Sequence, residues 1–204
     1  MFLTRRPSID HERMERMTFA RDNLGKIIEL GSITDIRARP LTGLDSGRLI
    51  AHFQRMNEVD RYTRFFSAVS DDGIRNIVNG FDWSRMIAVG AFRNNLLLGI
   101  AELGWEYGQT PARAELAMSV DREYRNVGLA SWLIKGPLRM GQDRGVREVY
   151  ASWIGGNDPV GRIMNRLNAR MSMDRSVCRA DITLDPLFTG ATEPDPRCCP
   201  PVTR

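Results

Sequence analysis

The chain has 204 residues, a formal net charge of +4, and 42% of its residues are apolar. This length and composition predict one soluble globular domain with short tails, because no segment approaches the roughly 18 consecutive apolar residues that a membrane-spanning helix needs. Lys26 and Lys135 are the only lysines, and the arginines are scattered among acidic residues. A nucleic-acid-binding protein would gather its basic residues into a stripe, so we expect no nucleic-acid partner.

The cysteines and histidines argue against two further classes of protein. The three cysteines show no C-x-x-C spacing, and His11 and His52 lie far apart along the chain. We therefore expect neither a bound metal nor a disulfide framework. The first residues carry no apolar core of signal-peptide length, which favours a reduced, cytoplasmic protein.

The first half of the chain predicts a strand, a helical region and a hairpin. Residues 1–31 are of mixed charge and are interpreted as an N-terminal extension. Apolar spacing then predicts, in order, a strand over 34–41, a helix over 45–56, a broken helical region over 60–66 and 71–81, and hairpin strands over 84–92 and 96–106. Asp71 and Asp72 are placed as caps of the later helical part.

The second half alternates strands and helices before a tail. The pattern predicts, in order, a strand over 114–120, a helix over 128–144, a strand over 147–154, a helix over 157–170 and a strand over 179–184. Gly136-Pro137 should interrupt the first of these helices. Residues 185–204 hold five prolines and are expected to form a flexible tail.

This order of elements predicts the fold class. A domain over 32–184 would have an α/β fold with a mixed, mostly antiparallel central sheet flanked by helices. Its parallel part would be the strand–helix–strand around Gly128, because parallel neighbours need a crossover connection.

The stretch "EYRNVGLASWL", residues 123–133, joins a strand to a helix through small residues. The N–H groups of a helix's first turn lack partners inside the helix and carry partial positive charge, so they attract phosphate where side chains leave room. Gly128 has no side chain and Ala130 has only a methyl group. A third glycine is missing, which argues against a dinucleotide-binding fingerprint, and the absence of Gly-Lys-Ser/Thr argues against a P-loop.

The same stretch resembles the Q/R-x-x-G-x-G/A motif of the GNAT family of N-acetyltransferases, with Arg125, Gly128 and Ala130 at the defined positions. The strand before it, the later helix started by Asn157 and the order of elements are also similar to that family. The resemblance implies the GNAT fold, acetyl-CoA as cosubstrate without a metal, and a turn that holds the pyrophosphate. That turn consists of Arg125, Asn126, Val127, Gly128, Leu129, Ala130 and Ser131.

A narrower resemblance concerns the acceptor. "DRYTRFF" (60–66), followed by "AELAMSV" (114–120), is similar to the GNAT domain of bacterial protein lysine acetyltransferases. It implies a protein lysine as the amine acceptor. A small-molecule amine as the acceptor stays open, as does a non-catalytic module that binds acyl-CoA. The chain could also form a homodimer. Tyr62, Phe65 and Phe66 either line the acceptor site or pack in the core.

Acetyl transfer to an amine needs a group that takes the ammonium proton and a donor for the developing oxyanion. Glu115 stands in an otherwise apolar strand, and the resemblance implies that it is the base; the alternatives are that it faces solvent or pairs with an arginine. Glu102, on the preceding strand, is the other candidate carboxylate. The resemblance also implies an oxyanion donor among the backbone N–H groups near Met118 or Val120. Asn157 is expected to touch the pantetheine arm, to cap its helix, or both.

One departure from the family concerns the proton that the leaving thiolate receives. Many members supply it from a tyrosine near the last long helix, but no tyrosine follows Tyr150 here. Ser172 or Cys178 could serve instead, or the thiolate could leave without a protein acid. The helix also ends in "RLNARMSM" in place of the ending common in the family, which leaves the acceptor specificity open.

Overall fold

The computed structural model describes residues 28–30, 33–105 and 112–184. The strands are β1 (Ile28–Leu30), β2 (Ile33–Pro40), β3 (Met86–Arg93), β4 (Leu96–Gly104), β5 (Arg113–Val120), β6 (Glu148–Ile154), β7 (Arg170–Asp174) and β8 (Val177–Thr183). The α-helices are α2 (Ser46–Arg55), α3 (Glu58–Phe65), α4 (Asp71–Asn79), α5 (Leu129–Leu133), α6 (Lys135–Asp143) and α7 (Asp158–Arg166), with 3₁₀ turns η2 (Gly43–Asp45) and η3 (Arg122–Tyr124).

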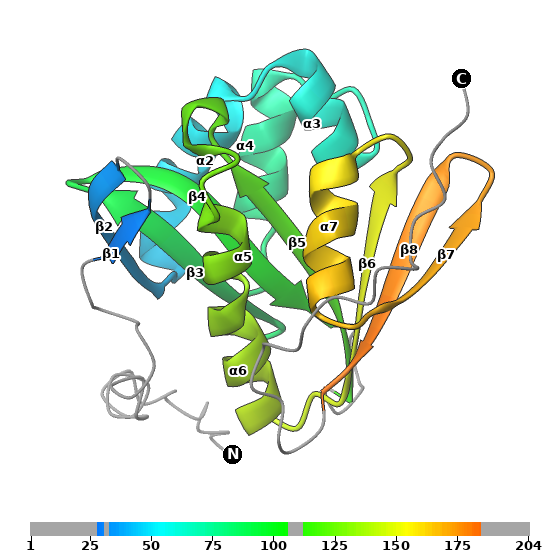
Figure 1. Cartoon of the computed structure of the whole chain (residues 1–204). Coiled ribbons are helices and arrows are strands. Elements are labelled where there is room, and N and C mark those ends of the chain that lie inside the picture. Colours follow the sequence, from blue (N-terminus) through cyan, green and yellow to red (C-terminus); the bar gives the residue numbers. More distant parts are fainter. Residues whose placement is uncertain (1–27, 31–32, 106–111, 185–204) are drawn as a thin grey trace, which may run out of the picture.

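The described strands form one sheet of eight, in the order β1-β2-β3-β4-β5-β6-β8-β7. Neighbouring strands are antiparallel except for β5 and β6, which run parallel. The crossover between these two strands contains α5 and α6 (Figure 1). The predicted mixed, mostly antiparallel sheet with its strand–helix–strand unit around Gly128 is therefore confirmed.

Helices cover both faces of the sheet and enclose two apolar cores (Figure 1). On one face α5, α6 and α7 bury side chains such as Leu133, Leu138 and Met164 against the strands, in the larger core. On the other face α2 and α4 bury Phe53 and Ile74, in the smaller core. Because successive side chains of a strand point to opposite faces, the central strands β3 and β4 contribute to both cores.

The crossover helix is broken in two at Ile134, between α5 and α6. Pro137 has no N–H to donate to the carbonyl of Leu133 one turn earlier, so a continuous helix would lose a hydrogen bond there. The predicted interruption of this helix is thus confirmed, but it lies at Ile134, and Gly136-Pro137 belong to the first turn of α6.

Several predicted boundaries need correction. β1 lies inside the stretch assigned to the N-terminal extension and pairs with β2. The helix predicted over 157–170 ends at Arg166, because Asn168 takes a left-handed conformation (φ 53°), and β7 follows. The N-cap of α4 is Ser70, whose side chain accepts from the Gly73 N–H, so the two aspartates placed as caps belong to the first turn. The predicted tail, 185–204, lies outside the described residues.

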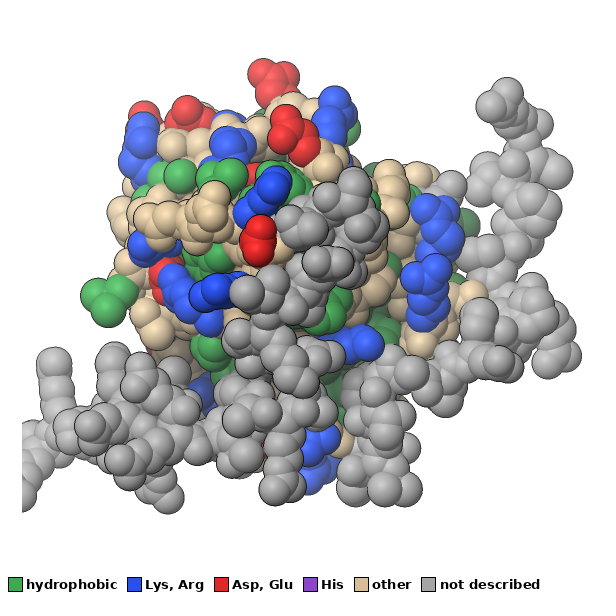
Figure 2. Space-filling model, turned by 60° about the vertical axis from the view of Figure 1, so that its left-hand side comes forward, with side chains coloured by type: hydrophobic (Ala, Val, Ile, Leu, Met, Phe, Trp, Pro, Cys, Tyr) green, Lys and Arg blue, Asp and Glu red, His purple; other side chains and the backbone are tan. Residues whose placement is uncertain are grey.

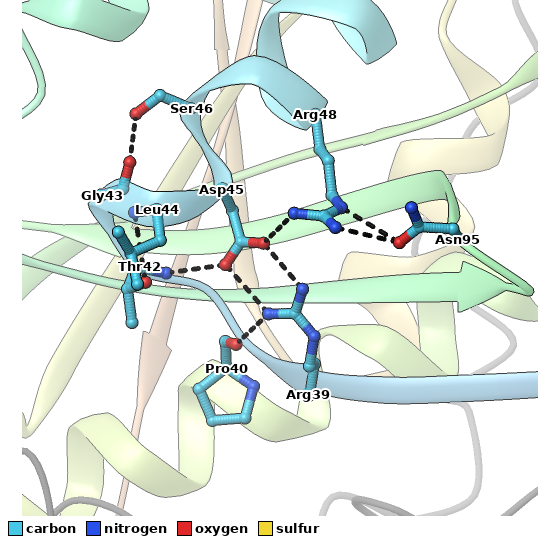
Figure 3. A network of polar contacts seen from close by, with 9 residues as sticks. All are labelled: Arg39, Pro40, Thr42, Gly43, Leu44, Asp45, Ser46, Arg48 and Asn95. Atoms are coloured by element: carbon cyan, nitrogen blue, oxygen red, sulfur yellow. Dashed lines mark hydrogen bonds and ion pairs between the residues drawn. The ribbon is translucent and has the colours of Figure 1, made fainter.

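A closed polar network holds the start of α2 (Figure 3). Asp45 is 3% exposed and accepts two hydrogen bonds from Arg39, 2.7 Å and 2.9 Å long. It also accepts from the Thr42 N–H, and Arg48 reaches it at 3.4 Å while binding Asn95 in the β3–β4 turn. The network therefore joins β2, α2 and the β3–β4 hairpin.

The surface of the described part carries mixed charge. On the face drawn in Figure 2, Lys and Arg side chains are scattered over the surface and do not form one stripe. None of the helices in the described ranges has both the length and the apolar character of a membrane span.

Candidate active site

A cleft opens where β5 and β6 separate. The two strands pair only over three positions, from Arg113 with Glu148 to Glu115 with Tyr150. Beyond these positions both strands continue without pairing to each other, and a cleft of about 590 Å³ lies between them. This volume is typical of small-molecule sites. The cleft thus lies beside the parallel pair that the sequence predicts.

The start of α5 forms one end of the cleft. Gly128 lines it with φ at 90°, a left-handed conformation that favours glycine, and Asn126 has φ at 62°. The first hydrogen bond of the helix runs from the Trp132 N–H to the Gly128 carbonyl. The N–H groups before Trp132 are therefore free of helix partners, and nothing lies within 4 Å of where a Gly128 side chain would begin.

Arginines give the cleft a positive charge. Arg125 is committed to the fold: its Nε donates to the Val120 carbonyl at 2.9 Å, and Nη1 lies 3.0 Å from Asp60 Oδ1. Arg122, Arg162 and Arg166 also line the cleft, and none of the three pairs with a carboxylate in the part of the chain that the structure describes. These three guanidinium groups can meet an anionic ligand.

Nine of the predicted cofactor residues line this one cleft: Met118, Val120, Arg125, Asn126, Gly128, Leu129, Ala130, Ser131 and Asn157. Val127 does not line it and instead packs against the larger core. Asn157 occupies the N-cap position of α7 but makes no side-chain capping hydrogen bond, so its amide is available to a ligand.

The predicted base, Glu115, is exposed on β5 and is not among the residues that line the cleft. It lies two residues before Ala117, which does line it, and the two side chains share one face of the strand. The alternative carboxylate, Glu102, forms an ion pair with Arg64 of α3, and both side chains are 13% exposed. Glu102 is thus paired with Arg64, whereas Glu115 is exposed to solvent two residues before the nearest cleft residue on its face of β5.

Helix α3 forms a further wall of the cleft, through a face of the helix that the sequence analysis did not single out. Asp60, Thr63 and Arg64 line the cleft. Phe65 packs beside Phe53 in the smaller core, as one of the two interpretations had it. Tyr62 and Phe66 are 51% and 44% exposed and do not line the cleft.

Sequence reasoning also missed two hydroxyl groups of the cleft. Ser119, near the end of β5, and Tyr124, in η3, both line it. Ser119 stood inside the quoted strand, but its polar side chain carried no motif. Ser172 and Cys178, considered as proton donors, lie on β7 and β8 and do not line the cleft.

Several solved structures share its fold. The GNAT domain of S. lividans PAT superposes with a TM-score of 0.65 at 20% identity, covering 78% of this chain and 96% of that one. An acetyltransferase of the GNAT family from Streptococcus pneumoniae gives 0.59 at 16%, covering 74% and 99%. A cAMP-binding acyltransferase from Mycobacterium smegmatis gives 0.57 at 19%, covering 83% of this chain but only 50% of its own.

No curated protein sequence matches the chain. A family model does: the acetyltransferase (GNAT) family matches residues 51–162, which is more than half of the chain and contains α3, β5, the start of α5 and most of α7. Enzymes of this family transfer an acyl group from acetyl-CoA to an amine. The chain therefore belongs to the acetyltransferase (GNAT) family and is an acetyl-CoA-dependent N-acetyltransferase.

Proposed function

We propose that the acceptor is the side-chain amine of a protein lysine. The observation that carries this proposal is the build of α3. The helix presents Asp60, Thr63 and Arg64 to the cleft, and beside that face it exposes Val59, Tyr62 and Phe66 to solvent.

These three side chains are 71%, 51% and 44% exposed; Val59 and Tyr62 lie one turn apart on the helix, and Phe66 follows directly after its end. Exposed apolar side chains gathered beside a site are typical of protein-binding surfaces. A free amine of low molecular weight would not need such a surface. The similarity of fold to the GNAT domain of S. lividans PAT, a protein acetyltransferase, supports the same acceptor class.

Acetyl-CoA would lie with its phosphates at the first turn of α5. Arg122, Arg162 and Arg166 would neutralise phosphate charge there. The pantetheine arm would run between β5 and β6 past Asn157. Its thioester would reach the middle of β5, where the Met118 or Val120 N–H would meet the oxyanion.

Glu115 would take the first proton from the lysine ammonium. Its exposure lets it pass that proton to solvent, and a lysine that enters past α3 meets this face of β5 first. Glu115→Gln should lower turnover at neutral pH by roughly 10²–10⁴-fold. The melting temperature and acetyl-CoA affinity should hardly change; if turnover also stays at the wild-type level, Glu115 is not the base.

An acceptor panel tests the acceptor class. The purified protein is incubated with acetyl-CoA and with poly-L-lysine, a mixture of bacterial proteins, spermidine or free lysine, and released thiol and acetylated product are measured. We expect the polypeptide acceptors to be acetylated fastest. The triple change Val59→Ser, Tyr62→Ser, Phe66→Ser should raise KM for them without changing acetyl-CoA binding. Equal turnover of spermidine by both proteins, with no acetylated polypeptide, would point to a small-molecule acceptor.

The cofactor end is tested by two variants of Gly128. Gly128→Ala introduces the backbone strain of a side chain at positive φ, about 1–2 kcal/mol, but no charge. Gly128→Glu adds a carboxylate that opposes the phosphates and should weaken acetyl-CoA binding by roughly 100-fold relative to Gly128→Ala. Calorimetric titration of both variants measures this difference; equal affinities would mean that the phosphates bind elsewhere.

A further inference from the structure

Three side chains form a connected line from the acceptor side of the cleft into the protein. Ser119 Oγ forms a hydrogen bond of 2.8 Å with His52 Nε2, and His52 Nδ1 lies 2.8 Å from Asp121 Oδ1, within ion-pair distance but not aligned as a hydrogen bond. Ser119 lines the cleft and is 8% exposed, whereas His52 is completely buried. A hydroxyl beside an imidazole that is beside a carboxylate is the arrangement with which serine hydrolases move a proton to and from a hydroxyl.

The fold brings these residues together from distant parts of the chain. Ser119 is in register with Ile100 of β4, whose side chain belongs to the smaller core under α2. The Ser119 side chain thus points toward α2, where His52 lies in the last turns. Asp121 follows directly after β5, and its other oxygen, Oδ2, accepts from Arg55 at 2.7 Å.

The charge on Asp121 fixes the tautomer of His52. Burial raises the pKa of this carboxyl, but its contacts with His52 and Arg55 outweigh burial and lower its pKa below the usual value. An ionised carboxylate only accepts hydrogen bonds. We therefore assign the proton of His52 to Nδ1, facing Asp121, and the lone pair to Nε2, facing Ser119.

The reaction leaves one proton transfer without a group to perform it. An ammonium acceptor loses two protons: one before it attacks the thioester, and a second as the C–N bond forms. Coenzyme A leaves as a thiolate when the C–S bond breaks, and it needs one proton to become the thiol. Among the described residues only one tyrosine, Tyr124, lines the cleft, and the hydroxyl and thiol considered earlier on β7 and β8 do not.

We propose that Ser119, His52 and Asp121 form a relay that carries this second proton from the acceptor nitrogen to the departing sulfur. As the C–N bond forms, the Ser119 hydroxyl accepts the proton from nitrogen while its own proton passes to His52 Nε2. Asp121 stabilises the resulting imidazolium. As the C–S bond breaks, His52 returns its proton to Ser119, and Ser119 donates to the thiolate.

The relay rests on the acetyl transfer proposed above and adds to it. The first proton still leaves through Glu115 to solvent, so the atoms balance: ammonium and thioester give amide, thiol and one released proton. Ser119 is the residue that touches the reacting atoms, and His52 and Asp121 act through it. A purely structural histidine would join α2 to β5 with the same contacts, so the test must read proton position and chemistry as well as stability.

The tautomer of His52 is measured first, because this measurement requires no amine acceptor. The chain has two histidines, so long-range ¹⁵N–¹H spectra contain two ring systems, and His11→Gln identifies the signals of His52. We expect the Nδ1–H tautomer in the wild type, with and without CoA. The Nε2–H tautomer would overturn the relay, because the ring could then not accept a proton from Ser119.

Kinetics are measured next with the polypeptide acceptor of the panel above. Ser119→Ala and Asp121→Asn should each lower kcat by roughly 100-fold, within the range of general acid–base catalysis, with KM and CoA affinity little changed. Asp45→Asn is the matched control: it weakens a buried aspartate network at the other end of α2 and should change the melting temperature but not kcat. Tyr124→Phe tests the competing proton donor.

The outcomes separate the relay from the proposed function. An active wild type with unchanged kcat in Ser119→Ala overturns the relay and leaves acetyl transfer standing. Loss of kcat in Tyr124→Phe alone assigns the proton to Tyr124 and overturns the relay too. If Asp45→Asn loses kcat as much as Asp121→Asn, the effect is one of stability, and the relay is again wrong. A wild type that acetylates no acceptor overturns both proposals together.

Discussion

An aspartate fastens each end of helix α2 to the sheet, the buried Asp45 at its start and the partly buried Asp121 at its end, but only Asp121 is linked to a residue of the cleft. At its start, Asp45 binds Arg39, Arg48 and the Thr42 N–H (Figure 3). At its end, Asp121 binds His52 and Arg55, and His52 continues to a serine in the cleft wall. The two ends use the same acceptor group and differ in the partner.

The partner decides what such a network can do. A guanidinium keeps its proton at any physiological pH, so the Asp45 network can hold geometry but cannot pass a proton on. A neutral imidazole can accept a proton at one ring nitrogen and donate one from the other. Burial and ion pairing alone therefore do not distinguish a structural carboxylate from one that takes part in proton transfer. The partner of the carboxylate, a guanidinium or an imidazole, distinguishes them.

The largest effect on the structural end is expected from Asp45→Ala. It removes hydrogen bonds to a charged group and leaves Arg39 without its partner, which should lower the free energy of unfolding by about 2–3 kcal/mol. Turnover at 20 °C should match the wild type, because the network does not touch the cleft. Urea unfolding and steady-state kinetics on one preparation measure both. A fall in kcat without a fall in stability would contradict the purely structural role of the Asp45 network at the start of α2.

The contribution of the Asp45 network to the free energy of unfolding should depend on pH in the acid range. Hydrogen bonds from Arg39 outweigh burial and lower the pKa of Asp45, so its folded pKa lies below the unfolded value of about 3.9. The stabilisation is present above that value and is lost as the pH falls through the folded pKa. The gap in unfolding free energy between wild type and Asp45→Asn should thus be full at pH 7 and shrink below about pH 4. A gap that stays constant down to pH 2 would assign it to packing.

A smaller effect is expected from Arg55→Ala at the other end. Arg55 is partly exposed and shares Asp121 with His52, so its loss should destabilise the fold by about 1 kcal/mol. Asp121 keeps its contact with His52, and kcat should therefore change far less than in Ser119→Ala. Thermal unfolding and the acceptor assay test this order; an equal loss of kcat would mean that Arg55 takes part in the relay.

The smallest effect is expected from Arg48→Ala. Its contact with Asp45 is 3.4 Å long and its side chain is exposed, and Asp45 keeps both hydrogen bonds from Arg39. We expect a loss of about 0.5 kcal/mol or less. A double-mutant cycle with Asn95→Ala separates the contact to the hairpin turn. A loss above about 1 kcal/mol would show that the turn, and not Asp45, anchors the start of α2.

The sequence predicted those parts whose signal is local. Buried strands such as β3 and β4 show apolar runs, and the cofactor residues around Gly128 are consecutive, so both could be recognised without the fold. β7 could not, because it is an edge strand with little buried apolar surface and therefore no alternating pattern. The contact of His52 with Ser119 spans 67 positions and depends on the register of β5 beneath α2, which periodicity does not encode.

The early end of pairing between β5 and β6 has a consequence for local opening. Beyond Glu115 the backbone groups of β5 that face β6 have no strand partner, so their amide hydrogens should exchange with deuterium faster than those facing β4. The pantetheine arm is an extended chain with two amide groups and can take the place of the missing strand. Binding would then slow exchange in this segment alone, and the ligand would become the strand that completes the sheet.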